Sequence, residues 1–284
     1  MPDRDTPPRL PRRALLAAAM AMGAALPLPG ARAAGLTLGG TGMAIAITRL
    51  LLDEWLRGGG GVPATVLNSL GSAGGLAALR AGRIDIALAG RPLTPAEQAQ
   101  GLVATTFATN PLAVATHEAT PADGVTTAEL ADALSGELTS WPGGGPLRVV
   151  RRDRAEGDWI LLSSLSPEIA LAVDRAHARP GLATAGTDQE NAELLERIQG
   201  SFGIISVGQA MAERRRLRLL ALDGVAPTLE ALVSGRYRLS RALAVVTRGE
   251  APAAAQAFLD FLASPPARAL LRAHGYVPVP AEAA

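Results

Sequence analysis

Short runs of strand-forming residues alternate with segments of helical spacing along most of this chain, and no other feature of the sequence limits the fold as strongly. Between the first two runs, Ala44, Ile47, Leu51 and Trp55 recur at helical spacing. Strands that alternate with helices are typical of βαβ units, so the sequence predicts an α/β fold with a largely parallel sheet. The candidate strands are residues 36–38, 62–67, 84–88, 112–116, 147–150, 203–206, 217–221 and 242–247.

The first 33 residues have the features of an export signal. Arginines precede an apolar run over residues 14–26, and small residues around Ala31 and Ala33 form a cleavage site. The apolar run is shorter than the roughly 20 residues that span a bilayer as a helix. We therefore expect a signal peptide over residues 1–33 and a periplasmic protein. The pair Arg12 and Arg13 fits both the twin-arginine route and an ordinary signal.

The composition excludes several classes of function. The absence of cysteine removes thiol nucleophiles, disulfides and cysteine metal sites. All 27 basic residues are arginine, so no lysine can form a pyridoxal phosphate Schiff base or serve a Walker P-loop. Residues 1–33 hold five arginines and two aspartates, so the formal charge of +1 becomes −2 after cleavage. With only 3% aromatic residues as well, we expect no nucleic-acid partner.

Common catalytic and cofactor motifs are incomplete. His117, His177 and His274 stand far apart without metal-ligand spacing, so we expect no metal. Around Ser72, a leucine replaces the first glycine of the GxSxG hydrolase motif. Ile45 stands where a dinucleotide fingerprint needs its third glycine, so we expect no cofactor.

Two glycine-rich turns, residues 39–43 and 71–75, each lie where a predicted strand leads into a helix. Free backbone N–H groups at such helix starts favour negative charge, and Ser72 is a good N-cap residue. A capped helix without a ligand is the alternative for each turn. The arginine-rich segment 151–154 after another predicted strand favours an oxyanion site, because guanidinium groups form forked hydrogen bonds to oxyanions.

An ordered set of motifs resembles the phosphate-binding protein of phosphate ABC transporters, a family of two-lobed periplasmic solute-binding proteins. The resemblance covers most of the chain after residue 33 and implies two α/β lobes joined by a hinge of crossing strands. The motifs are residues 71–75, 84–87, 91–93, 149–152, 222–228, 234–237 and 274–278.

The resemblance also implies an oxyanion site made of backbone N–H groups, hydroxyls and one arginine. The family's first-turn contacts fall on Thr41, Gly42 and Met43. The second-turn hydroxyl falls on Ser72 and the arginine on Arg152. A further ligand-binding position, the glycine of the anion loop, falls on Gly157.

The chain departs from the family pattern at two places in this site. Gly90 stands where the family has an aspartate that accepts the proton of hydrogen phosphate. Glu156 and Asp158 flank the glycine of the anion loop, where they would repel a dianion unless they turn outward or pair with Arg151, Arg154 or Arg91. Because Gly90 offers no side-chain acceptor, we expect weaker discrimination between hydrogen phosphate and sulfate than the usual family site gives, whereas Glu156 and Asp158 argue against any bound anion.

These observations lead to one main hypothesis and three alternatives. We expect a discontinuous first lobe, residues 34–112 and 240–284, and a second lobe, residues 113–239. The candidate strands 112–116 and 242–247 should pair and form the hinge between the lobes, and residues 258–276 should pack on the first lobe. The chain would be a monomeric, non-enzymatic component of an ABC transporter that captures phosphate or a related oxyanion and delivers it to a membrane permease. The alternatives are the same fold with another small polar solute, a sensory or interaction protein, and a hydrolase with a base beside Ser72 or Thr41.

Overall fold

The strands follow the order β2-β1-β3-β10-β4-β8-β6-β7 in the computed structural model, which describes residues 35–154 and 156–279. Strand β11 pairs with β4, while β9 pairs with both β4 and β5. The predicted signal peptide, residues 1–33, lies outside the described residues. The strands are β1 (Leu36–Gly40), β2 (Ala64–Val66), β3 (Ile86–Ala89), β4 (Leu102–His117), β5 (Gly124–Val125), β6 (Arg148–Arg152), β7 (Ala183–Ala185), β8 (Ser201–Ser206), β9 (Leu217–Leu222), β10 (Ser240–Arg248) and β11 (Val277–Pro278).

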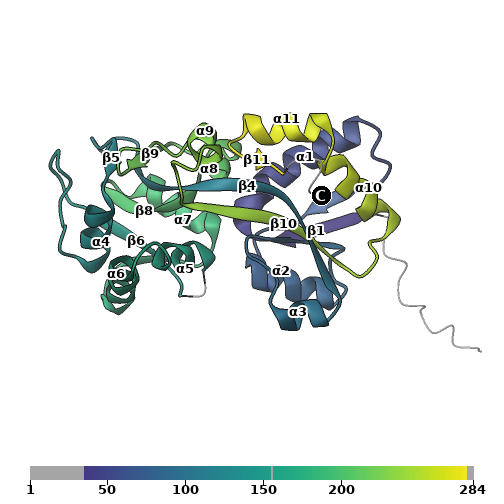
Figure 1. The fold of residues 1–284 in the computed structure, drawn as a ribbon, viewed down its shortest axis with the longest axis horizontal. Coiled ribbons are helices and arrows are strands. Elements are labelled where there is room, and N and C mark those ends of the chain that lie inside the picture. The colour runs from purple at the N-terminus through teal and green to yellow at the C-terminus, as the bar shows by residue number, and fades with distance from the viewer. Residues whose placement is uncertain (1–34, 155, 280–284) are drawn as a thin grey trace, which may run out of the picture. The chain divides into compact units, whose positions relative to one another are not determined.

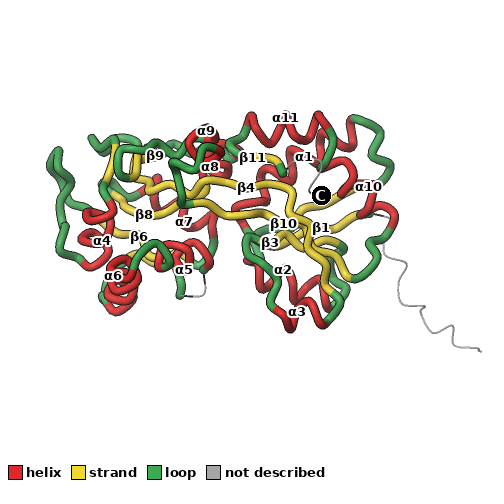
Figure 2. Tube along the Cα trace, viewed as in Figure 1, coloured by secondary structure: helices red, strands yellow, loops and turns green. Residues whose placement is uncertain are grey.

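Helices connect most of these strands, as the alternating pattern predicts (Figures 1 and 2). A 3-10 turn, η1 (Gly42–Ala44), leads directly into the first of them. The helices are α1 (Ile45–Arg57), α2 (Gly71–Arg80), α3 (Pro95–Ala99), α4 (Thr127–Ser135), α5 (Gly157–Ser163), α6 (Pro167–Ala178), α7 (Asp188–Arg197), α8 (Val207–Ala212), α9 (Leu229–Val233), α10 (Ala253–Leu262) and α11 (Pro265–Ala273).

The sheet is mixed, which corrects the expectation of a largely parallel one. Strand β1 pairs in parallel with β2 and β3, and β6 pairs in parallel with β7 and β8. The central strands differ: β10 is antiparallel to β3 and β4, and β4 is antiparallel to β8, β9 and β11. The α/β class is confirmed, but β4 and β10 run against their neighbours.

Strands β4 and β10 lie side by side in Figure 1 and connect the two parallel parts of the sheet. Their pairing runs from Leu102 opposite Arg248 to Pro111 opposite Ser240. The sequence predicted that residues 112–116 pair with residues 242–247. In fact residues 112–117 of β4 pair with β8 and β9, and the earlier half of β4, which the sequence analysis missed, pairs with β10.

The C-terminal helices pack on α1, the first α-helix of the described chain. The buried face of α1 includes Ile47, Leu51 and Trp55, and the ring of Trp55 meets that of Phe258 in α10 edge to face, with centroids 5.5 Å apart. Burial of these large side chains is the main stabilising force for such a contact. Helices α10 and α11 are thereby held against α1, near the first strands of the sheet, as predicted for residues 258–276.

Candidate functional site

The turn after β1 is built on close backbone packing. Gly40 has φ of +150°, and a Cβ at this position would overlap the carbonyl oxygen of Leu88 in β3. The N–H of Thr41 donates to that same oxygen over 2.9 Å. Only glycine permits this close approach of the two backbones. Residues 41–43 and the start of α1 therefore follow directly at the carboxyl end of β1.

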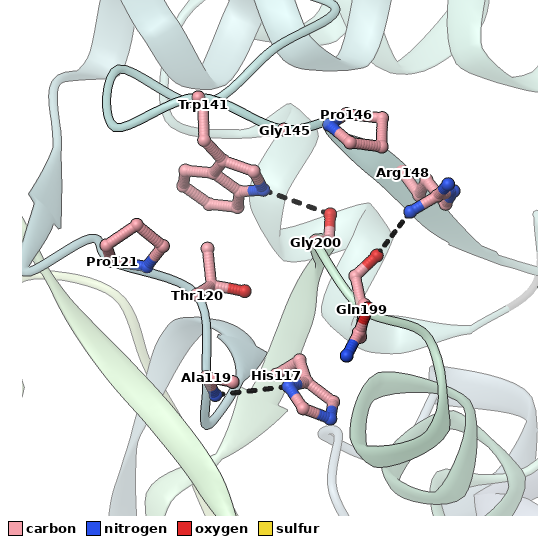
Figure 3. A pocket seen from close by; sticks show the side chains of 11 residues that line it. His117, Ala119, Thr120, Pro121, Trp141, Gly145, Pro146, Arg148, Gln199 and Gly200 are labelled. Atoms are coloured by element: carbon pink, nitrogen blue, oxygen red, sulfur yellow. Dashed lines mark hydrogen bonds between the residues drawn. The ribbon is translucent and has the colours of Figure 1, made fainter.

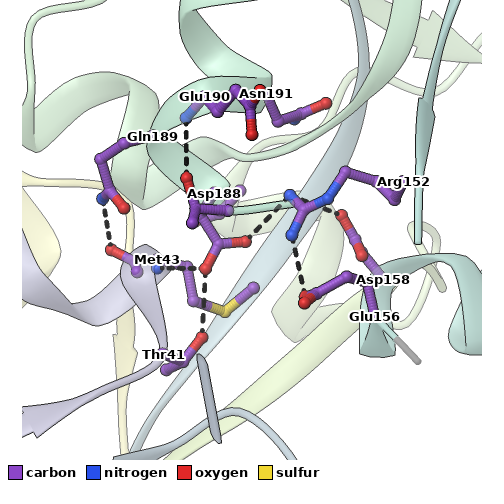
Figure 4. Close-up of polar contacts among 12 residues, drawn as sticks. Thr41, Met43, Arg152, Glu156, Asp158, Asp188, Gln189, Glu190 and Asn191 are labelled. Atoms are coloured by element: carbon purple, nitrogen blue, oxygen red, sulfur yellow. Dashed lines mark hydrogen bonds and ion pairs between the residues drawn. The ribbon is translucent and has the colours of Figure 1, made fainter. Parts of the chain in front are cut away.

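Three donors converge on the carboxylate of Asp188, the first residue of α7 (Figure 4). Its Oδ2 accepts from the Thr41 hydroxyl over 3.3 Å and from the Met43 N–H over 3.0 Å. Its Oδ1 accepts from Nη1 of Arg152 over 3.2 Å. We call the Thr41 hydroxyl, the Met43 N–H and Arg152 Nη1 the anion cradle. All four residues are buried, with 1–6% of their surface exposed.

Arg152 ends β6 and interacts with three carboxylates. In addition to Asp188, its Nη2 meets Glu156 Oε2 at 2.8 Å and its Nη1 lies 3.6 Å from Asp158 Oδ2. The buried Nε of Arg152 has no hydrogen-bond partner among the described residues. Glu156 and Asp158 thus neither turn outward nor pair with the three arginines proposed from sequence.

Burial and charge oppose each other in this cluster. Burial alone would lower the pKa of Arg152, but the nearby charges of Asp158, Asp188 and Glu156 outweigh it and raise that pKa. Burial also raises the pKa of Glu156 and that of Asp158, and in both cases Arg152 acts in the opposite direction. Arg152 therefore stays charged, while these two carboxylates ionise less readily than in water.

A second buried cation, Arg241 of β10, lies beside Gly90 and Gly157. Its Nε donates to the Gly90 carbonyl over 2.7 Å, and a Cβ at Gly157 would overlap its guanidinium. A Cβ at Gly90 would lie 3.1 Å from Arg241 Nη2 and 3.4 Å from the sulfur of Met43. Where the resemblance expects an acidic side chain, this chain thus presents an arginine.

Ser72 does not cap its helix, contrary to the prediction. Helix α2 begins at Gly71 with Leu70 as its N-cap residue, so Ser72 lies within the first turn. Its hydroxyl accepts from the Gly90 N–H over 3.0 Å. Gly90 in turn touches Arg241, so Ser72 is linked to the cluster through one residue and does not contact Asp188.

The other arginines proposed as partners lie outside the cluster. Arg151 points to the opposite side of β6, where its Nη1 donates to the carbonyl of His177 over 2.9 Å. Arg154 pairs with Asp174 on the surface, and Arg91 forms a two-fold contact with Glu97. Of the segment 151–154, only Arg152 reaches the anion cradle.

Asp188 and Arg241 were not among the site residues predicted from the sequence. For Asp188 a local signal existed: Thr187 and Glu190 enclose it in the T-x-x-E pattern of a helix start, and Thr187 does cap α7. An acidic residue in the first turn is ordinary for a helix, so this pattern alone does not indicate a site. Arg241 carries no comparable signal, because its role depends on the pairing of β10 with β3 and β4.

A family model described as "PBP superfamily domain" matches residues 29–266. The chain belongs to the PBP superfamily. The curated "Phosphate-binding protein PstS" of Borreliella burgdorferi is 27% identical to it over 202 residues, which are 68% of this chain and 71% of that protein. The family resemblance drawn from the sequence motifs is confirmed.

Solved structures agree with this PBP superfamily fold. A putative phosphate ABC transporter substrate-binding protein from Clostridium perfringens with bound phosphate aligns with a TM-score of 0.73 at 20% identity, over 86% of this chain and 99% of that one. An ABC-type phosphate transport receptor from Vibrio cholerae aligns with a TM-score of 0.62 at 22% identity, over 85% and 99%. At these identities the structures establish the fold alone.

A pocket of about 290 Å³ lies elsewhere in this PBP superfamily chain and shares no residue with the anion cradle (Figure 3). His117, Trp141 and Arg148 line it. Their polar atoms contact backbone: His117 Nδ1 accepts from the Ala119 N–H, while Trp141 and Arg148 donate to carbonyls of residues 199–200. We assign no ligand to this pocket.

Residues 35–154 and 156–279 contain no group of three or more acidic, histidine or cysteine side chains arranged to hold a metal ion. None of the helices in this part of the chain combines the length and the apolar character needed to cross a bilayer.

Proposed function

We propose that the mature chain is the periplasmic solute-binding component of an ABC transporter and that it captures phosphate or a related oxyanion between two lobes. In this proposal residues 1–33 are removed on export, residues 34–112 and 240–284 form the first lobe, and residues 113–239 form the second. The protein acts as a monomer, carries out no chemistry and delivers its solute to a membrane permease.

The convergence of the anion cradle on one carboxylate is the observation that carries this proposal. A hydroxyl, a backbone N–H and a guanidinium, from segments about 110 residues apart, surround two oxygen atoms of one anionic group. The same donors suit two oxygens of a phosphate or a sulfate. The Nε of Arg152, which has no hydrogen-bond partner within residues 35–154 and 156–279, offers one further donor.

The proposed ligand-binding residues are Thr41, Gly42, Met43, Ser72, Arg152 and Gly157. Thr41, Met43 and Arg152 supply the anion cradle. Gly42 and Gly157 permit close approach of Asp188 and Arg241, and Ser72 holds the backbone of Gly90. PstS of Borreliella burgdorferi, whose name describes a phosphate-binding protein, supports phosphate as the first solute to test.

Calorimetric titration with phosphate and with sulfate tests this function. We expect the wild type to bind both, with affinities within about tenfold of each other, because Gly90 offers no side-chain acceptor for the proton of hydrogen phosphate. Arg152→Ala should weaken binding about thirty-fold or more. Arg152→Lys keeps the charge but loses the forked contact, and should weaken binding about tenfold.

A different small polar solute is the second candidate, and the three carboxylates around Arg152 favour it. Glu156, Asp158 and Asp188 can accept hydrogen bonds from a solute that carries N–H or O–H groups. If the wild type binds neither phosphate nor sulfate at millimolar concentration, capture of an oxyanion is wrong and this candidate replaces it.

A further inference from the structure

The carboxylate of Asp188 uses the donors that the proposed function assigns to an external oxyanion. Oδ2 accepts from Thr41 and Met43, and Oδ1 accepts from Arg152 (Figure 4). Both oxygens are therefore satisfied by the anion cradle, and the side chain is buried. The cradle holds an anion that belongs to the chain itself.

Close packing at Gly42 and two hydrogen bonds hold Asp188 in this position. A Cβ at Gly42 would lie 2.7 Å from Asp188 Oδ2 and 2.8 Å from Asp188 Cβ, so a larger residue would exclude the carboxylate. The Gln189 amide donates to the Gly42 carbonyl over 2.9 Å. The Gln209 amide donates to the Asp188 carbonyl over 3.2 Å. Several contacts thus hold the start of α7 against the turn of residues 41–43.

The charges of the cluster oppose a second anion while Asp188 stays in place. Arg152 and Arg241 carry two positive charges, and Glu156, Asp158 and Asp188 carry up to three negative ones. An oxyanion added to this set would meet an excess of like charge and occupied donors. Removal of Asp188 from the cradle relieves both obstacles at once.

We propose that Asp188 is an internal occupant of the anion cradle, which competes with external oxyanions and thereby limits how tightly the protein binds them. The proposal rests on the proposed function, because it concerns the same donors. It assigns to Asp188 the role of an affinity-determining residue: an oxyanion binds only when Asp188 leaves Thr41, Met43 and Arg152.

Phosphate titration of the wild type, Asp188→Ala and Asp158→Asn tests this proposal. Asp188→Ala frees the cradle, so we expect it to bind phosphate at least tenfold more tightly than the wild type. Asp158→Asn removes a negative charge from the same arginine but leaves the cradle occupied, so we expect less than a threefold change. Circular dichroism checks that each variant is folded. If Asp188→Ala does not fold, Asp188→Asn keeps the shape of the side chain, and its neutral amide should still raise the affinity at least threefold.

The outcomes separate this proposal from the proposed function. If the wild type binds phosphate and Asp188→Ala binds no more tightly, the function stands and the competition is refuted. Equal gains in Asp188→Ala and Asp158→Asn also refute it, because the effect is then one of net charge. If only Asp188→Ala binds phosphate at millimolar concentration, the internal occupant is supported and phosphate capture by the wild type is wrong. If no variant binds any oxyanion, both proposals are wrong.

Discussion

Arg152 is the residue on which the charged cluster depends, because three carboxylates face its buried guanidinium. Arg152→Ala leaves Asp158, of which only 4% is exposed, without its cation. We expect the free energy of unfolding at pH 7 to fall by about 3–5 kcal/mol, as for other broken buried pairs. Chemical denaturation measures this change. Arg154→Ala is the control: it removes an exposed surface pair with Asp174 and should cost about 0–1 kcal/mol. Equal losses in the two variants would contradict the account.

The buried carboxyl of Asp158 should make the free energy of unfolding depend on pH, and the sign of this dependence follows from its raised pKa. Burial raises the pKa of its carboxyl, with Arg152 acting against the shift. The folded state therefore binds this proton more tightly than the unfolded state does, where the pKa is about 3.9. The resulting stabilisation is fully present below that value and is lost as pH rises through the folded-state pKa. Relative to Asp158→Asn, the free energy of unfolding of the wild type should thus fall as pH rises above about 4. A rise over this range would show that the Arg152 interaction dominates.

Helix α3 begins with a capping box that also contains an ion pair. Glu97 accepts from the Thr94 N–H, and both of its oxygens accept from Arg91 at 2.8 Å. The hydrogen bonds from Arg91 lower the pKa of Glu97 to about 2. Glu97→Gln should reduce the free energy of unfolding by about 1 kcal/mol at pH 7.

Thermal denaturation against pH checks this prediction. Since the pKa of Glu97 is lowered on folding, its stabilisation is present above about pH 4.3 and disappears as pH falls towards about 2. Glu129→Gln, in the capping box of α4 formed with Thr126, is the matched control, because Gln keeps the capping geometry and only the negative charge is lost. We expect a smaller loss there at pH 7. A Glu97→Gln effect that persists at pH 2 would contradict the role of the ion pair.

A tyrosine of the C-terminal segment also contacts the turn of residues 41–43. The hydroxyl of Tyr276, which is fully buried, donates to the Met43 carbonyl over 2.9 Å. Tyr276→Phe leaves this carbonyl without its partner, so we expect a loss of about 1–3 kcal/mol in the free energy of unfolding. It should also weaken phosphate binding, because Met43 supplies one of the cradle donors. Tyr237→Phe, which removes a hydrogen bond to the Leu112 carbonyl, is the control: it should affect stability but not affinity.

Sequence patterns predicted the regular elements well and the long-range ones less well. Each of the eight candidate strands overlaps an observed strand, because buried strands are short apolar runs. The earlier half of β4 escaped prediction: residues 102–111, LVATTFATNP, mix strand-forming Val, Thr and Phe with Ala, Asn and Pro, which are depleted in strands, and pairing with β10 stabilises this segment. The antiparallel direction of the central strands depends on that same pairing, which no local pattern records.

Part of the candidate site was predictable, because the family resemblance assigned Thr41, Met43 and Arg152 to one site and the structure brings them together around Asp188. Their contact with a solute stays a prediction. Asp188 and Arg241 were not predictable. In its local sequence, Asp188 is an ordinary acidic residue in the first turn of a helix. Only the tertiary fold brings it next to residues 41–43. Glu156 and Asp158 were recognised as a conflict, but their partner was sought among neighbouring arginines, since the direction of the Arg152 side chain was unknown.

At the scale of the whole molecule, the fold positions the anion cradle through its strand order. Strand β1 presents Thr41 and Met43, β6 presents Arg152, and the long strands β4 and β10 lie between them in the sheet. The site therefore depends on how these two parts of the chain are held together. A solute bound there would contact both parts at once, which is the arrangement that a capture protein requires.

Native mass spectrometry of the protein equilibrated with phosphate tests the central claim most directly. At the concentration that half-saturates the wild type, we expect one phosphate on about half of the chains and, in Arg152→Lys, on about a tenth of them. Absence of any adduct at millimolar phosphate, or equal occupancy in the two proteins, would contradict a phosphate site at Arg152.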